Sequence, residues 1–250
     1  MKKCVISCIA AVAALAVAAA PARSSTRVGG RTGSGASAKA AQGGEGKVRI
    51  EQFPRPGRQS TLNAPHVEGG STIGNNVYSK SSTRKWIVLE AKYETFDNWT
   101  DQLNFTWHVM LDADKATEKD KEDRGKIARF SYYTVTVSYM NIPRGTHAAS
   151  VCLPPACLER FGEPGAIGIV ITNRDGEPIV LDVQSEIKGI DSHPKAMDEA
   201  FWNNKGIMEK EVESKNGERR RLVEQRQGLL DRSKTIWALV NPNDYEQVVQ

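Results

Sequence analysis

The histidines and one cysteine pair are the residues of this chain best suited to bind a metal ion or to act as nucleophiles. The histidines are His66, His108, His147 and His193. They are scattered along the chain, and none has the spacing of an HExxH zinc motif. His147 and the cysteines that follow it also lack a CxxC knuckle. The sequence therefore predicts no metal site and no bound cofactor.

Cys152 and Cys157 could form a disulfide, which an exported chain permits. Closing so short a loop would stabilise the fold by about 2 kcal/mol. Two prolines lie between the cysteines and favour extended backbone, so the chain would have to reverse sharply to bring the Cα atoms within about 7 Å. A disulfide and a pair of separate, small, buried thiols therefore both stay open. A redox-active pair is disfavoured because the CxxC spacing is absent.

Acidic residues crowd the segment between Asp112 and Asp123 and are the other candidate metal ligands. An EF-hand would need a central glycine and a regular ligand spacing, whereas lysines interrupt these acids. A solvated loop between two strands is therefore the better interpretation. The chain also lacks a serine nucleophile elbow and a phosphate-binding glycine loop. We predict no catalytic residue and no enzyme activity.

Residues 1–22 have the three parts of a secretory signal peptide. Two lysines precede an apolar run from Cys4 to Ala20, and small residues follow at Ala20–Ala22. No later segment is apolar for long enough to span a membrane, so we expect an exported protein with no integral membrane segment after processing. The 34 Lys and Arg of the chain, two of them in this leader, nearly balance its 30 Asp and Glu. Nucleic acid is therefore not an expected partner.

Residues 23–82 are rich in Gly, Ser, Ala, Arg and Pro. The aromatic residues of this segment, Phe53 and Tyr78, are isolated in the sequence. So few large apolar groups cannot offset the entropy that is lost when a backbone becomes ordered. The segment is therefore predicted to be a disordered linker.

Apolar and polar residues alternate strongly from Trp86 onward, which is typical of half-buried strands. The predicted strands are Trp86–Tyr93, Leu103–Leu111, Tyr133–Tyr139, His147–Leu153, Ile167–Thr172 and Pro178–Ser185. We expect the first two to be separated at Asp97–Asn98 and the next two by a turn at Pro143–Gly145.

Short strands at this density, without long helices between them, predict an all-β fold. We expect residues 83–190 to form an immunoglobulin-like antiparallel β-sandwich with short helical turns, and a barrel is the competing closure. Residues 191–250 are predicted to be an irregular C-terminal extension that docks on the sandwich.

Three segments together resemble an exported family of the Verrucomicrobia, and they are Trp86–Trp99, Tyr139–Gly162 and Leu229–Tyr245. Members of this family in Akkermansia lie in a type IV pilus-like gene cluster and have an immunoglobulin-like β-sandwich. The resemblance implies this fold and a bacterial protein of the periplasm or outer cell surface. It supplies no catalytic residue. The family has apolar residues near the positions of Cys152 and Cys157, which favours buried thiols there.

Our preferred hypothesis is a non-catalytic, exported β-sandwich protein that takes part in envelope or type IV pilus-associated assembly. It would act by protein binding, because an exposed strand edge can accept a strand from another protein through backbone hydrogen bonds. The expected partners are envelope or pilus-associated proteins, and the oligomeric state is left open. The alternative is an extracellular glycan-binding protein or hydrolase, in which His108, His147 and the tryptophans would be the working groups.

Overall fold

The computed structural model describes residues 47–63, 85–115, 128–213, 217, 219–235 and 237–240. All of them belong to one compact unit of the chain. The predicted signal peptide lies outside the described residues, as does the predicted linker before Lys47 and from residue 64 to residue 82. Within the described part of the chain, no helix is long and apolar enough to cross a membrane.

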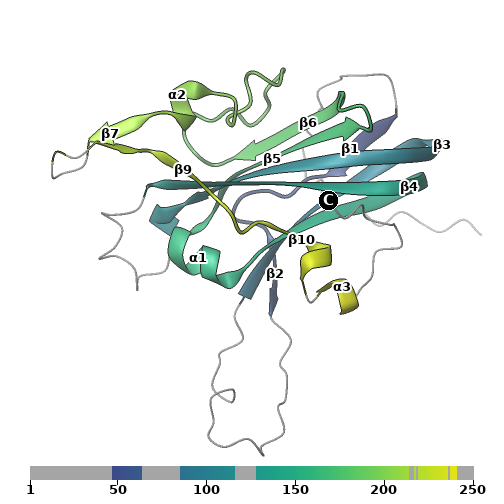
Figure 1. Cartoon of the computed structure of the whole chain (residues 1–250), viewed down its shortest axis with the longest axis horizontal. Coiled ribbons are helices and arrows are strands. Elements are labelled where there is room, and N and C mark those ends of the chain that lie inside the picture. Colours follow the sequence, from purple (N-terminus) through teal and green to yellow (C-terminus); the bar gives the residue numbers. More distant parts are fainter. Residues whose placement is uncertain are drawn as a thin grey trace, which may run out of the picture. The chain divides into compact units, whose positions relative to one another are not determined.

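The described strands form one eight-stranded sheet and one two-stranded sheet (Figure 1). Two long strands, β3 (Lys85–Asp112) and β4 (Phe130–Leu153), pair antiparallel and form the centre of the large sheet. The other strands of this sheet are β1 (Val48–Gln52), β2 (Ser60–Asn63), β5 (Glu163–Asn173), β6 (Pro178–Ser185), β9 (Val223–Arg226) and β10 (Leu230–Asp231). The small sheet consists of β7 (Glu211–Glu213) and β8 (Arg219–Arg221). The helical segments are η1 (Ala113–Lys115), α1 (Pro155–Phe161), α2 (Lys205–Met208), η3 (Arg232–Lys234) and α3 (Trp237–Val240).

The sequence prediction of a break at Asp97–Asn98 and a turn at Pro143–Gly145 is wrong, because both segments lie inside the long strands. At this place residues 96–98 of β3 lie opposite the single residue Arg144 of β4. Such a bulge bends a pair of strands without ending it. The pairs that flank the bulge are Thr95 with Gly145 and Trp99 with Pro143.

The backbone of β4 is unusual on its side of the bend. Asn141 has a φ of 56° and Gly145 a φ of 141°. Asparagine and glycine tolerate positive φ better than other residues, which is why they are also common in turns. The turn-forming residues seen in the sequence therefore bend a paired ribbon here instead of reversing the chain.

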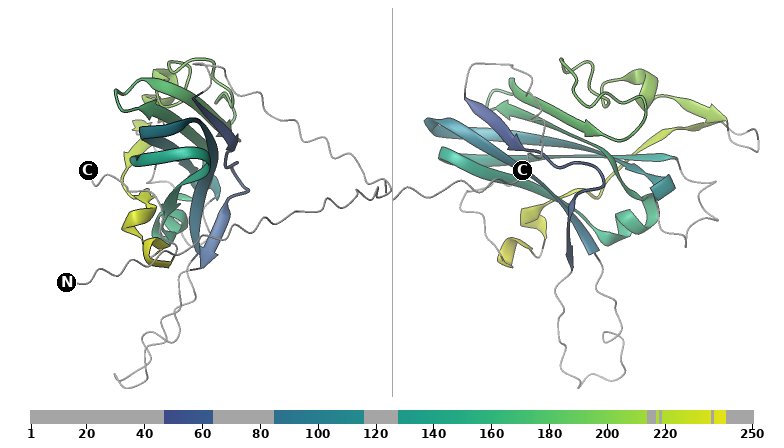
Figure 2. Two further views of the ribbon diagram at one scale, coloured as in Figure 1. Left: turned by 90° about the vertical axis from the view of Figure 1, so that its right-hand side faces the viewer. Right: turned by 180° about the vertical axis from the view of Figure 1, so that it is seen from behind.

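The bend folds the sheet into two layers around one core (Figure 2). The first layer contains residues 85–95 of β3 and 145–153 of β4, extended by β1, β2 and β10. The second layer contains residues 99–112 of β3 and 130–142 of β4, extended by β5, β6 and β9. The predicted all-β antiparallel sandwich is confirmed. Two details go beyond the prediction: the layers are continuous through the bent strands, and the β4–β9 pair is parallel.

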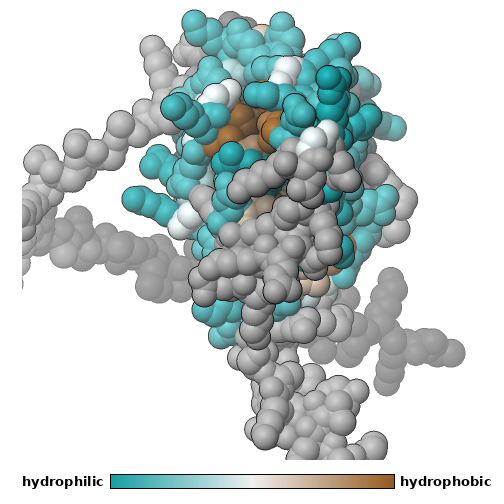
Figure 3. Space-filling view, turned by 90° about the vertical axis from the view of Figure 1, so that its left-hand side faces the viewer, coloured by the Kyte–Doolittle hydropathy of each residue, from teal (hydrophilic) through white to brown (hydrophobic). Residues whose placement is uncertain are grey.

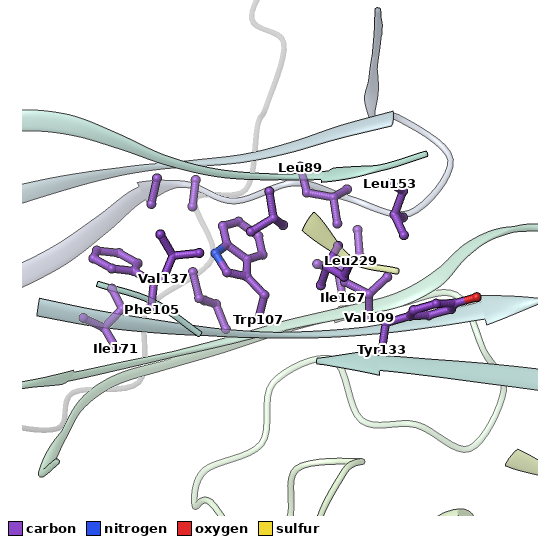
Figure 4. Packing of buried hydrophobic residues seen from close by; sticks show 14 of the residues in the cluster. Leu89, Phe105, Trp107, Val109, Tyr133, Val137, Leu153, Ile167, Ile171 and Leu229 are labelled. Atoms are coloured by element: carbon purple, nitrogen blue, oxygen red, sulfur yellow. The ribbon is translucent and has the colours of Figure 1, made fainter. Parts of the chain in front are cut away.

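The core between the layers is built from alternate residues of β3, β4 and β5 (Figure 4). Tyr93 of the first layer packs against Phe105 of the second, with ring centroids 4.8 Å apart. Trp107 is fully buried near the middle of the cluster. Because these side chains come from both halves of β3, burial of apolar surface holds the bend closed.

The prediction of a disordered linker is wrong for residues 47–63. β1 and β2 both pair with β3, and between them the ring of Phe53 stacks on Trp107 with centroids 6.1 Å apart. Val48 is buried in the same core. This segment is poor in apolar residues, but Val48, Ile50 and Phe53 pack on the core of the sandwich, so their burial offsets the cost of ordering the backbone.

Residues between β6 and β7 pack on the outer face of the second layer, over a second apolar cluster. The indole of Trp202 lies flat on the imidazole of His108, with centroids 3.8 Å apart and planes 4° apart. Gly168 of β5 makes this possible, because a Cβ atom there would lie 2.2 Å from Cζ3 of Trp202. Phe201 packs edge-on against Trp202 and Tyr132. The packing of the segment between β6 and β7 on this face therefore depends on a few aromatic contacts.

Candidate functional site: the open edge of β4

The histidines singled out in the sequence are used in packing at different places. His108 lies under Trp202, and its Nδ1 atom is 2.7 Å from the hydroxyl oxygen of Tyr132. Burial lowers the pKa of His108 from 6.5 to about 3, so the ring is neutral at physiological pH. His193 is exposed, and His66 lies outside the described residues. Among the described residues, no three His, Cys, Asp or Glu side chains form a group that could hold a metal ion.

His147 lies beside the bulge in the first layer. Its Nε2 donates a hydrogen bond to the carbonyl oxygen of Pro143 at 2.8 Å. The hydroxyl of Thr95 donates to the same carbonyl oxygen, also at 2.8 Å. These two bonds give the carbonyl oxygen of Pro143 its hydrogen-bond partners at the place where the β3–β4 ladder is interrupted. His147 therefore has a structural role.

The acidic residues between Asp112 and Asp123 are described only at the start of the segment. Arg129 contacts both described acids, with its Nε 3.8 Å from Oδ1 of Asp112 and its terminal nitrogen 3.1 Å from Oδ2 of Asp114. An arginine paired with these carboxylates opposes a cation at the same place. The remaining acids lie outside the described residues.

Both cysteines are free thiols in the structure, so the disulfide considered from the sequence is not formed in it. Cys152 is buried on β4 between Val88 and Leu230, and burial raises the pKa of its thiol to about 11. Cys157 is partly buried on α1, and burial raises the pKa of this thiol as well. Both sulfurs are therefore protonated at neutral pH, when thiols are poor nucleophiles.

Residues 223–231, which we call the strap, cross from the second layer to the first. β9 pairs with residues 130–133 of β4, and β10 pairs with residues 151–152. Between these strands Leu229 enters the core. At the start of the strap the guanidinium of Arg226 lies 4.1 Å from the ring centroid of Phe161 and donates to the hydroxyl of Ser131 at 3.0 Å.

Replacing Gly228 in the strap by alanine is expected to lower the free energy of unfolding by about 2 kcal/mol. Gly228 has a φ of 140°, and a Cβ atom there would lie 2.8 Å from the sulfur of Cys157. Urea unfolding of the single and double variants tests this. Cys157→Ala should recover part of the loss in the double variant by removing the overlap. Strictly additive effects of the two substitutions would contradict the contact.

Between the two ends of the strap, no strand of the described part of the chain lies along the edge of β4 that faces away from β3. The backbone N–H of Phe130 donates on this side to the carbonyl of Leu222. Backbone groups alternate along a strand, and the β3–β4 register is unbroken here, so the even residues up to Met140 present their N–H and C=O groups on the same side. On this side, none of the described strands pairs with β4 between residues 134 and 140, although Ser138 has a further interaction within the chain. We call residues 134–140 the open edge.

Two features mark the ends of the open edge. At one end, the pairing of β4 with β9 stops at Tyr133, which pairs with Arg226. At the other end Asn141 has its positive φ, and the strand bends towards the first layer. Beyond the bend, the N–H of Ser150 donates to the hydroxyl of Tyr139 at 3.4 Å. The edge of β4 in the first layer therefore has a hydrogen-bond partner within the chain at this residue.

The open edge carries no charged side chain, and there is none from Phe130 to Pro143. β6, the edge strand on the opposite side of the second layer, is different. It begins with Pro178, which lacks an N–H group, and it contains Asp182, whose pKa is raised by burial. Proline and a partly buried charge are common means of protecting an edge strand from pairing with another chain. By this criterion β6 is protected and the open edge of β4 is not.

Apart from its backbone edge, the described surface offers little apolar area. The view in Figure 3 is mostly hydrophilic, with a small hydrophobic area. Among the described residues, the exposed large apolar side chains are Leu62, Trp99 and Val212, and they come from three different strands. Scattered single residues of this kind are normal on a soluble protein. The open edge is therefore the better candidate for an interaction site.

The fold defines the class of protein: an all-β antiparallel sandwich, here with an uncharged segment of β4 that no described strand pairs on the side away from β3. A solved structure supports the fold. It is a crystal structure of a protein from Akkermansia muciniphila, with a TM-score of 0.51 and 15% sequence identity, and the match covers 82% of this chain and 94% of that chain. At this identity the likeness shows the fold alone. No curated protein matches the chain.

A protein-family model matches residues 41–249, which is most of the chain. The chain belongs to this family, and the sequence-based assignment to the Akkermansia family is confirmed. The match begins well before Trp86, in agreement with the participation of residues 47–63 in the fold.

Proposed function

We propose that this protein is an exported, non-catalytic β-sandwich module of envelope or type IV pilus-associated assembly. It binds protein chains by accepting an extended strand along the open edge of β4. The observation that carries the proposal is the uncharged run from Thr134 to Met140, which among the described strands pairs with β3 alone and stands between segments of β4 that also pair with β9 and β10. Strand addition satisfies the exposed backbone groups and needs no pocket.

The surroundings of the candidate catalytic groups support a role without chemistry. His108 is held neutral beneath an indole, and His147 donates to a backbone carbonyl at the bend. Both cysteines have raised thiol pKa values. A catalytic acid, base or nucleophile needs a pKa suited to proton transfer or attack, and the pKa values of His108 and of the two thiols are shifted away from that range.

The envelope and pilus part of the proposal rests on the family. Members in Akkermansia lie in a type IV pilus-like gene cluster, and the leader of this chain has the pattern of an exported protein. Pilus assembly joins many chains through repeated contacts, and a strand edge is a contact of adequate strength that requires little sequence-specific chemistry.

Photo-crosslinking tests the proposal. The photoreactive residue p-benzoylphenylalanine is placed at Thr134 of the full chain, which is irradiated with the envelope fraction of its own bacterium, and adducts are identified by mass spectrometry. We expect a peptide from an envelope or pilus protein to be linked at Thr134. The matched control carries the same photoreactive residue at Arg174, which is exposed in the β5–β6 turn.

A second substitution separates strand pairing from simple proximity. Thr136→Pro removes an outward N–H group without interrupting the pairing with β3 and should reduce the adduct at least about tenfold. Thr136→Val keeps that N–H group and should retain the adduct. Equal labelling from Thr134 and Arg174 would contradict the proposal. An adduct only with a second copy of the chain would contradict a role in joining another envelope protein.

A further inference from the structure

Trp99 has the most exposed large apolar side chain among the described residues, with an exposed fraction of 54%. It lies in β3 directly after the bulge, opposite Pro143 of β4. Residues that lie opposite each other in an antiparallel pair share a face of the sheet, with Cβ atoms about 4.5–5.5 Å apart. The indole therefore stands next to the proline ring. Bulges turn side chains in a new direction, and here the bulge presents an aromatic ring to solvent.

The backbone around this indole is held on both strands. The carbonyl oxygen of Pro143 accepts hydrogen bonds from the hydroxyl of Thr95 and from Nε2 of His147, both at 2.8 Å. On the other strand, the N–H of Phe96 donates to the carbonyl oxygen of Lys47 at 3.1 Å. The indole is therefore presented on a fixed backbone, and a ligand that binds there does not have to order a loop.

Exposed polar side chains lie along the same two strands, within two residues of Trp99 or of Pro143. They are two carboxylates, two amides and one guanidinium, from Asp97, Asp101, Asn98, Asn141 and Arg144. Arg144 lies opposite the bulge, and the register on either side places Asn141 opposite Asp101. None of these side chains is hydrogen bonded or ion-paired to another described residue. Their polar groups are therefore available to a ligand.

An aromatic face beside polar side chains is suited to hold a sugar ring. One face of a pyranose carries mainly C–H groups, which are weakly positive and pack on the negative face of an indole. The hydroxyl groups around the sugar ring each donate and accept hydrogen bonds. Carboxylates accept such bonds, a guanidinium donates them and amides do both, so the side chains near Trp99 supply partners of every kind.

Other classes of ligand fit this surface less well. A stable protein interface buries at least about 1,000 Å² around an apolar centre, whereas the other exposed large apolar side chains, Leu62 and Val212, lie on other strands. Two carboxylates against one guanidinium give the surface a net negative charge, which opposes an anionic ligand such as a nucleotide. A neutral carbohydrate is therefore the best match.

We propose that the bend of β3 and β4 binds a neutral carbohydrate. One sugar ring stacks on Trp99, and its hydroxyl groups bond to the surrounding aspartate, asparagine and arginine side chains. The site lies outside residues 134–140 of β4, and the inference goes beyond the proposed function. Carbohydrate binding and strand addition can therefore be tested separately.

An array of neutral oligosaccharides of glucose, galactose and N-acetylglucosamine tests the site with the purified chain. We expect the wild-type chain to bind at least one of them. Trp99→Ala should weaken that binding at least about tenfold, whereas Trp99→Phe keeps an aromatic face and should retain most of it. Val212→Ala removes an exposed apolar side chain elsewhere and is the matched control, with wild-type binding expected. Thermal melts check that each variant is folded. Binding to none of the oligosaccharides, or equal binding by wild type and Trp99→Ala, overturns the inference.

A sulfated form of the bound oligosaccharide tests the charge of the ligand. The sulfate should weaken binding at least about threefold, because the carboxylates repel it. Replacing both carboxylates, in the double variant Asp97→Asn and Asp101→Asn, should reduce this difference. A sulfated form that binds the wild-type chain more tightly than the neutral form would overturn the proposed ligand class.

Photo-crosslinking separates this site from the strand edge. Trp99→Ala should leave the adduct at Thr134 unchanged, because Trp99 lies on β3 and outside the open edge. Loss of that adduct would show that Trp99 is a protein contact and would overturn its assignment to a carbohydrate. Labelling at Thr134 no stronger than at Arg174, together with oligosaccharide binding that depends on Trp99, would remove the proposed function and leave this inference intact.

Discussion

A chain that begins at Ser82 is expected to lose at least about 5 kcal/mol of its free energy of unfolding relative to a chain that begins at Lys47. The removed segment carries β1, β2 and the ring of Phe53, which stacks on Trp107. Each well-buried apolar side chain contributes about 1.5–3 kcal/mol, and Val48, Ile50 and Phe53 all pack on the core. The loss is of the same order as the whole stability of a typical domain.

Urea unfolding followed by circular dichroism measures this loss. The shorter chain is expected to be largely unfolded without denaturant, whereas the chain from Lys47 should show one cooperative transition. A disordered linker would give the opposite result, since its removal changes no packing. Equal unfolding midpoints for the two chains would therefore contradict the structure of residues 47–63.

Single substitutions show whether the stacked ring is the main contribution. Phe53→Ala should lower the free energy of unfolding by about 2 kcal/mol, because it uncovers one face of Trp107. Arg55→Ala, two residues away and exposed, should change it by less than about 0.5 kcal/mol.

The segment around Phe53 also shows why the sequence misled on this point. Its apolar residues are sparse and follow no helical or strand period, which favours a linker. The partner of Phe53 is Trp107, a residue far along the chain, and local composition contains no information about such a contact. The alternating parts of β3 and β4 were predictable because their period of two is a local property.

The bend shows a second limit of the sequence. Pro143 and Gly145 are residues that end strands in many proteins, and the segment Pro143–Gly145 predicted a turn. In the structure they accommodate a bulge within a paired strand. The same backbone conformations serve both purposes, so only the pairing partner on β3 distinguishes them.

The sequence predicted the kind of candidate site, an edge strand, but not its position in the sheet. The sequence indicates a sandwich, and a sandwich has edge strands, so strand addition could be expected. The uncharged run from Phe130 to Pro143 is visible in the sequence. Which part of that run is covered on the side away from β3 depends on the parallel β9 strand, which comes from much later in the chain and carries no strong strand pattern.

Lowering the pH from 7 to 4 is expected to remove about 3 kcal/mol of stability through His108 alone. Burial under Trp202 lowers the pKa of His108 to about 3, whereas the unfolded chain has the ordinary value of 6.5. Below pH 6.5 the unfolded state binds a proton that the folded state does not, so the free energy of unfolding falls by about 1.4 kcal/mol per pH unit. The loss continues until the pH reaches the folded pKa.

The comparison of wild type with His108→Phe isolates this effect. Phenylalanine keeps a flat ring under Trp202 but cannot be protonated, so its unfolding free energy should fall less than that of the wild type between pH 7 and pH 4. Other groups cancel in this difference, including Asp182, whose raised pKa adds stability as the pH falls through it.

A direct titration provides the second measurement. The imidazole resonances of His108 should still report a neutral ring at pH 5. Parallel stability curves for the wild type and His108→Phe, or a protonated His108 at pH 5, would show that Trp202 does not cover this ring in solution. The segment between β6 and β7 would then not be packed on the outer face of the second layer, because the Trp202–His108 stack is the contact that places Trp202 over Gly168.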